Sequence, residues 1–150
     1  MAVYKSEVIV NESPEKVFEF FLNPHSLVDI TLPKLQLTIL NAPDVVEAGT
    51  EVEFQMTHFG QDLKATHEVV SLDNDCIVER QAKGVMKEFQ QERLIAGTDN
   101  GGCRIETTVN FVGPGGLIGA IMTEDRIRSS LDDAFEFQNQ ALQERFGAPE

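Results

Sequence analysis

The chain has 150 residues, a length that suits one domain and allows a sizeable hydrophobic core. Hydrophobic residues make up 41% of the chain and charged residues 25%, as in ordinary globular proteins. Because 12 basic residues face 25 acidic ones, the net charge of −13 repels phosphate backbones and anionic lipids, which argues against nucleic-acid and membrane partners.

The N-terminal residues and the cysteines favour a cytoplasmic location. Residues 1–7 have neither the basic start nor the apolar run of a signal peptide. No apolar run approaches the length of a membrane span, so we expect no membrane insertion. The two cysteines, Cys76 and Cys103, are too few for a disulfide framework, and we interpret them as reduced thiols near the starts of strands.

In chain order, the first predicted elements are a strand over residues 3–10 and a helix. Ser13 is a suitable N-cap, Pro14 suits the first helical position, and Glu15 suits the positive end of the helix. Because proline disfavours helix at the residue before it, the helix ends at Asn23. Its apolar face contains Val17, Phe18, Phe21 and Leu22.

The next segment is predicted to contain most of the sheet. Residues 25–33 are irregular or include a second short helix, and residues 35–39 alternate as a short strand. Residues 51–58 and 63–69 alternate between apolar and polar side chains, which is typical of half-buried strands. Three more strands follow after turns rich in Asp, Asn and Gly, over residues 76–82, 85–95 and 103–111.

The last segment has the spacing of a long amphipathic helix. Apolar residues recur every three or four positions, which predicts a largely continuous helix over residues 117–146, or one kinked near Thr123. Gly147 followed by Pro149 is a stop signal. Since no linker or repeat interrupts the chain, we interpret residues 1–150 as a single domain. The element order predicts an α+β fold with helices on one side of an antiparallel sheet.

Several motifs are similar to those of one known superfamily. Residues 13–18 (Ser-Pro-Glu-Lys-Val-Phe) look like its entry into a first helix, and residues 27–40 resemble the loop and second strand of a bacterial ligand-binding subgroup. Residues 77–84 and 89–95 match strands that read Phe-x-Asp-x-Gln-x-x-Gly and aromatic-x-His-x-His-x-Phe in that subgroup. The last helix matches at Arg128, Leu131, Phe135, Leu142 and Phe146.

The chain thus resembles the START-like or SRPBCC superfamily, which includes polyketide cyclase/dehydrase-like bacterial ligand-binding proteins and lipid-transfer domains. The resemblance covers nearly the whole chain. It implies the helix-grip fold, a curved antiparallel sheet of about six or seven strands wrapped around a long C-terminal helix, with a hydrophobic cavity between them. Glu79 replaces the usual Asp, and Gln91 and Arg93 stand where the subgroup has histidines, so the role of those histidines does not transfer.

Simple hairpin pairing predicts which side chains share the concave face of the sheet. The turn at Gly60 would set Phe54 opposite His67, and later turns would set His67 opposite Gln81. In the next strands, Glu79 would lie opposite Gln91, and Arg93 opposite Thr107. The expected polar patch is His67, Glu79, Gln81, Gln91, Arg93 and Thr107. The expected apolar ligand contacts are Phe54, Met56, Phe89, Val109 and Phe111, with Leu131 and Phe135 of the last helix.

Glu79 and Arg93 are predicted to be diagonal neighbours, roughly 7 Å apart at the backbone and within reach of each other. Three interpretations stay open for them. They form a buried ion pair that satisfies itself, or a pair that orients a ligand, or Glu79 is a catalytic general base. Pairing with Arg93 would lower the pKa of Glu79 and weaken the last role.

His67 is the second catalytic candidate, and its alternative interpretation is a core histidine bonded to Gln81. His58 lies on the same face about four residues along the strands, on the order of 13 Å away, which is too far for a shared metal. No Cys/His cluster has zinc spacing, so we expect neither a metal nor another cofactor.

The leading functional hypothesis is a cytoplasmic protein, monomer or homodimer, that binds a small, mainly apolar or aromatic molecule in an internal cavity. One alternative is a cyclase- or dehydratase-like enzyme acting on a polyketide-type carbonyl compound. Its acid/base groups would be Glu79 and His67, with Arg93 stabilising an enolate. Another alternative is a protein-interaction module that uses the acidic surface or the cavity rim.

Overall fold

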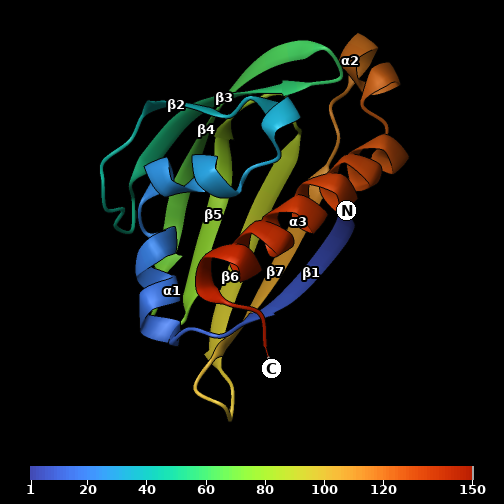
Figure 1. Cartoon of the computed structure of the whole chain (residues 1–150). Coiled ribbons are helices and arrows are strands. Elements are labelled where there is room, and N and C mark those ends of the chain that lie inside the picture. Colours follow the sequence, from blue (N-terminus) through green and yellow to red (C-terminus); the bar gives the residue numbers. More distant parts are fainter. Residues whose placement is uncertain (150) are drawn as a thin grey trace.

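A seven-stranded antiparallel sheet forms the body of the computed structural model, which describes residues 1–149. The strand order is β1-β7-β6-β5-β4-β3-β2, so only the first strand leaves chain order, to pair with the last. The sheet curves strongly (Figure 1). Its strands are β1 Ala2–Val10, β2 Thr38–Asn41, β3 Glu51–His58, β4 Gln61–Leu72, β5 Cys76–Lys83, β6 Glu88–Gly97 and β7 Cys103–Val112.

The helical elements lie over one face of this sheet (Figure 1). The long α3, Glu124–Phe146, crosses that face and packs against β1. This arrangement confirms the predicted α+β architecture with a curved sheet around a C-terminal helix. The other helical elements are α1 Pro14–Phe21, the 3₁₀ helices η1 Pro24–Ile30 and η2 Pro33–Leu35, and the short α2 Gly116–Ile121.

The start of α1 confirms its predicted signals. Ser13 is the N-cap, and its hydroxyl accepts a hydrogen bond from the Lys16 backbone N–H at 3.5 Å. Pro14 occupies the first helical position. The side chains of Val17 and Phe21 are almost completely buried and anchor α1 on the sheet.

The predicted continuous C-terminal helix is broken into two. Met122 leaves the helical conformation with ψ at 68°, and Thr123 starts α3 because its hydroxyl accepts the Arg126 N–H at 3.3 Å. The break therefore lies where a kink was predicted. The stop signal is confirmed: Gly147 has φ at 93°, and its N–H donates to the Gln143 carbonyl at 2.8 Å.

Two strand boundaries differ from the prediction. The strand predicted over residues 35–39 is displaced to Thr38–Asn41, because η2 ends at Leu35 and Gln36 adopts the left-handed conformation with φ at 47°. β6 begins at Glu88 instead of residue 85, so the turn after β5 is longer than expected.

The register is as predicted in the centre of the sheet and wrong at one hairpin. As predicted, Glu79 pairs with Gln91, His67 pairs with Gln81, and Arg93 pairs with Thr107. Phe54, however, lies opposite Ala65, because Phe59 and Gly60 form a two-residue turn with φ at 51° and 76°. The shift is an even number of residues, so the side chains keep their predicted face.

The core has two main parts at opposite ends of α3. One joins α1 to the sheet around Val10, Phe21 and Leu142. The other contains Val109 and Phe111, whose side chains are 0% and 1% exposed. In the part of the chain that the structure describes, no helix is both long enough and apolar enough to cross a membrane.

Candidate ligand-binding cavity

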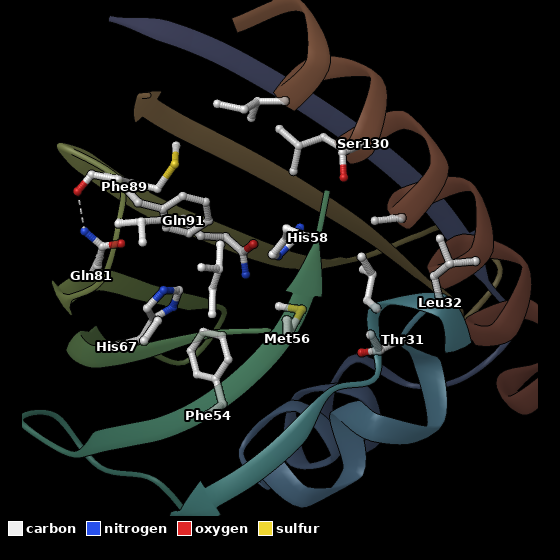
Figure 2. A pocket seen from close by; sticks show the side chains of 18 of the residues that line it. Thr31, Leu32, Phe54, Met56, His58, His67, Gln81, Phe89, Gln91 and Ser130 are labelled. Atoms are coloured by element: carbon white, nitrogen blue, oxygen red, sulfur yellow. Dashed lines mark hydrogen bonds between the residues drawn. The ribbon is translucent and has the colours of Figure 1, made fainter. Parts of the chain in front are cut away.

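A cavity of about 230 Å³ lies between the concave side of β3–β6, the η1–η2 segment and α3 (Figure 2). Most of its surface is apolar. The apolar lining is Ile30, Leu32, Leu35, Phe54, Met56, Phe59, Leu63, Ala65, Val85, Met86, Phe89, Met122, Ile127, Leu131, Ala134 and Phe135. The polar lining is Thr31, His58, Lys64, His67, Gln81, Gln91, Ser130 and Gln138.

Strand and helix periodicity explain why these side chains meet. In β3, Phe54, Met56 and His58 alternate onto one face, as strand geometry requires. In α3, lining residues recur every three or four positions from Ile127 to Gln138, which is one helical face.

Eight of the predicted ligand contacts line this cavity. They are Phe54, Met56, His67, Gln81, Phe89, Gln91, Leu131 and Phe135.

The other five predicted contacts lie outside the lining, which corrects the expectation of one shared surface. Val109 and Phe111 belong to the core beside the cavity, where they cluster with Met122, Ile127 and Phe135. Thr107, which is 3% exposed, and the charged residues Glu79 and Arg93 are neighbours of lining residues in the sheet but do not line the cavity themselves.

Several lining residues were missed by sequence reasoning. The η1–η2 segment carries Ile30, Leu32 and Leu35, whose irregular spacing gave no periodic signal. Ser130 was missed because it lies at the edge of the apolar face of α3. Gln138 had a usable signal, because it is a polar residue at a position where the helical spacing calls for an apolar one.

Glu79 does not form the predicted ion pair with Arg93 in the described residues. Its carboxylate accepts a hydrogen bond from the Gln91 amide at 3.0 Å, and the His67 Nδ1 lies 3.7 Å away. The Arg93 guanidinium points toward the helices instead. It stacks over the Phe21 ring at 4.1 Å and donates to Gln138 Oε1 at 3.4 Å.

The electrostatic surroundings keep Glu79 ionised. Burial raises the pKa of its carboxyl, but His67 and the Arg93 guanidinium together outweigh burial, so the pKa is lowered below its ordinary value. A carboxyl with a lowered pKa is a poor general base near neutral pH. This weakens the catalytic hypothesis for Glu79.

Arg93 is a buried cation with few partners. Its side chain is 6% exposed, and within residues 1–149 its Nε has no hydrogen-bond partner. Burial lowers the pKa of the guanidinium, which the charge of Glu79 partly opposes, but arginine stays protonated in proteins. The Glu79 carboxylate and the Arg93 guanidinium therefore place opposite charges next to lining residues of the cavity.

His67 is held by aromatic contacts. The edge of its ring meets Phe54 at 4.8 Å between centroids, and Phe89 lies 5.1 Å away on another side. The expected bond to Gln81 is not formed, because the Gln81 amide N–H donates to the Met86 carbonyl at 2.7 Å (Figure 2). Burial lowers the pKa of His58, so this second imidazole on the cavity surface is neutral near neutral pH.

The cavity opens near the turn between β3 and β4. A second, polar hollow of about 430 Å³ shares Leu35, His58, Phe59 and Ser130 with the cavity. It also contains Lys34, whose amino group lies 3.5 Å from the Asp133 carboxylate across the opening. A molecule entering from solvent would pass between this turn and α3.

No protein-family model matches the chain, and no curated protein matches it. Solved structures do match. The Zhui aromatase/cyclase from Streptomyces sp. R1128 is 18% identical with a TM-score of 0.73, over 96% of this chain and 92% of that one. Ginseng major latex-like protein 151 from Panax ginseng is 13% identical with a TM-score of 0.69, over 97% of both chains.

A third match, a protein from Chromobacterium violaceum, is 14% identical with a TM-score of 0.71 and covers 100% of both chains. These similarities confirm the helix-grip fold that the sequence predicted. At such identities they establish the fold and no more, because one fold carries many functions.

Proposed function

We propose that the protein binds a small, mainly apolar or aromatic molecule in the cavity between the sheet and α3. The observation that carries the proposal is the cavity itself: about 230 Å³ of space with a mostly apolar lining and a few polar groups. Protein interiors are otherwise close-packed, and this combination is typical of small-molecule sites.

The size and lining of the cavity indicate the class of ligand. A dry cavity of roughly 150 Å³ holds one benzene molecule, so this one suits a ligand of about two fused rings or a short acyl chain. Phe54, Phe89 and His67 supply ring faces and edges against which an aromatic ligand can pack.

We also propose a cytoplasmic location, and one solved structure of the same fold supports the binding proposal. Cys76 and Cys103 are free thiols, which suits a reducing cytoplasm. One protein with this fold is named an aromatase/cyclase, so the helix-grip fold is compatible with a small cyclic molecule inside it.

A cyclase- or dehydratase-like activity is the second candidate. The observation that favours it is the pair of imidazoles, His58 and His67, on the cavity surface. The lowered pKa of His58 leaves a neutral base near neutral pH. If the protein is such an enzyme, His58→Gln will abolish turnover of a polyketide-type substrate while its binding persists. Loss of binding and turnover together would leave only the binding role.

The binding proposal is tested with a neutral fluorescent probe of two fused rings, 1-aminonaphthalene, and a blocking substitution. Ala65→Trp places an indole in the cavity, because Ala65 lines it from β4. Ala82→Trp is the matched control, since Ala82 is an exposed alanine on the neighbouring β5. We expect wild type and Ala82→Trp to bind the probe and a folded Ala65→Trp variant not to. Equal probe binding by a folded Ala65→Trp protein would contradict the proposal.

A further inference from the structure

Two of the polar residues that line the cavity, Gln91 and Gln138, contact buried charged groups. Gln91 lies on β6 two positions from Arg93, and Gln138 on α3 contacts the Arg93 guanidinium. Both glutamines line the cavity, whereas Glu79 and Arg93 do not. Figure 2 shows the Gln91 amide pointing into the cavity.

The charged neighbour of each glutamine dictates which end of its amide faces the cavity. A carboxylate can only accept hydrogen bonds, so the Gln91 NH₂ group must face Glu79, at 3.0 Å, which leaves its carbonyl oxygen for the cavity. A guanidinium can only donate, so the Gln138 oxygen must face Arg93, at 3.4 Å, which leaves its NH₂ group for the cavity.

The orientation of these amides follows from donor and acceptor chemistry. The oxygen and nitrogen of an amide are otherwise interchangeable in shape, and their assignment depends on the hydrogen-bond network. Here the assignment is fixed, because the ionised Glu79 can only accept a hydrogen bond and the protonated Arg93 can only donate one. Gln91 therefore presents an acceptor to the cavity, and Gln138 presents a donor.

We infer that the ligand is a neutral apolar or aromatic molecule whose polar end both donates and accepts a hydrogen bond, such as a phenol, an alcohol or an amide, with Gln91 as acceptor and Gln138 as donor. The inference rests on the proposed binding function. Glu79 and Arg93 are then positioning residues that hold the two amides and do not touch the ligand.

The same geometry disfavours an anionic ligand. Arg93 is separated from the cavity by Gln138, and its charge is accompanied by that of Glu79. Lys64, the cation in the lining, is exposed to solvent. A carboxylate at the inner end would lose its hydration without a cationic partner and would face the Gln91 oxygen, which is unfavourable.

The test compares four naphthalenes of similar size as competitors of the fluorescent probe. 2-Naphthol donates and accepts, 2-methoxynaphthalene only accepts, 2-methylnaphthalene does neither, and 2-naphthoate is an anion. Each hydrogen bond changes the affinity by about 2- to 12-fold. 2-Naphthol can form one hydrogen bond more than 2-methoxynaphthalene and two more than 2-methylnaphthalene. We therefore expect its affinity to exceed that of 2-methoxynaphthalene by about 2- to 12-fold, and that of 2-methylnaphthalene by about the square of this factor. 2-Naphthoate should bind most weakly.

Variants separate the ligand contact from the positioning role. In Gln91→Met, the preference for 2-naphthol over 2-methoxynaphthalene should disappear, while Gln90→Met, on the exposed face of the same strand, should keep it. In Glu79→Gln, the Gln91 amide is free to turn its NH₂ group to the cavity. 2-Methoxynaphthalene should then gain affinity relative to 2-naphthol, with the affinity for 2-methylnaphthalene unchanged. A purely structural role of Glu79 would change all three affinities together.

The outcomes distinguish this inference from the proposed function. If 2-methylnaphthalene and 2-naphthol displace the probe equally, the cavity binds ligands but the donor and acceptor assignment is overturned. If none of the four competitors displaces the probe, the proposed function fails as well. If Ser130→Ala at the mouth removes the 2-naphthol preference and Gln91→Met keeps it, the polar contact lies at the opening and the inference is wrong. If the Glu79→Gln variant does not fold, the comparison of Gln91→Met with its control Gln90→Met still tests the inference.

Discussion

Replacing Arg93 and Glu79, singly and together, tests whether the two charges interact. Arg93→Met keeps an unbranched, apolar chain against Phe21, and Glu79→Gln keeps the shape and the hydrogen bond of the carboxyl group. The two residues have no ion-pair contact within the described chain, but the charge of each one affects the other's pKa. Their coupling is therefore expected to act through space.

The expected strength of this charge–charge attraction follows from the arrangement of the strands. Diagonal neighbours in a sheet lie roughly 7 Å apart, and at an effective dielectric constant of about 20 two unit charges at that distance attract by about 2 kcal/mol. Arg93→Met also loses the cation–π interaction with Phe21, which lowers the stability by about 1–2 kcal/mol. It removes the buried Nε that has no hydrogen-bond partner, and this raises the stability by about the same amount. Each single variant should thus lower the free energy of unfolding by about 2 kcal/mol.

The double variant should then lose about 2 kcal/mol less than the sum of the two single losses. Urea unfolding followed by circular dichroism measures this difference, since the chain has no Trp and one Tyr and gives little intrinsic fluorescence. Arg104→Met is the matched control: this arginine of β7 is 44% exposed beside Glu7, and its loss should change the stability by less than about 1 kcal/mol.

Two results would refute this reasoning. Single losses that add within about 0.5 kcal/mol would mean that the charges of Glu79 and Arg93 do not interact. A loss of about 3–5 kcal/mol in each single variant would instead indicate a direct buried ion pair, as the sequence suggested.

Three further predictions follow from local features. Because the folded-state pKa of Glu79 is lowered, the stability that it contributes is present above its ordinary pKa of 4.5 and lost as the pH falls through the lower folded value; the difference in unfolding free energy between wild type and Glu79→Gln should shrink over that range. Thr123→Ala removes the N-cap of α3 and should cost about 1 kcal/mol in thermal unfolding, whereas Thr123→Ser should not; equal losses would mean that the cap does not hold the break. Phe59→Asn relieves a left-handed conformation, with φ at 51°, and should stabilise the protein by up to about 1 kcal/mol while it weakens probe binding at the cavity; unchanged binding would remove Phe59 from the site.

The centre of the sheet could be predicted because its turns have recognisable chemistry. The oppositions of His67 with Gln81, and of Glu79 with Gln91, followed from Asp, Asn and Gly between alternating segments. The predicted register of the hairpin at Phe59 was wrong, because a Phe in the left-handed conformation gives no turn signal in the sequence. An Asn-Gly pair at this place would have indicated the two-residue turn.

The details of the site could not be predicted because they depend on where the helices pack. Strand register alone made Glu79 the natural partner of Arg93. In the folded protein Phe21 from α1 and Gln138 from α3 compete for the guanidinium and turn it away from β5. Periodicity identifies the inward face of a helix, but not which strand residue meets each turn of it.

The displacement of the two charges from the cavity explains how one site can be both apolar and selective. A bare Arg93 or Glu79 in the lining would need a charged ligand to satisfy it in a dry environment. Because Glu79 and Arg93 do not line the cavity, each instead contacts a neutral amide of the lining, Gln91 or Gln138, and these amides present oriented dipoles to the cavity. Dipoles oriented before binding need no reorganisation when the ligand enters, so they favour a matching hydrogen-bond pattern over mere apolar bulk. Discrimination between 2-naphthol and its methyl ether is therefore a sharper measure of this arrangement than affinity for any single compound.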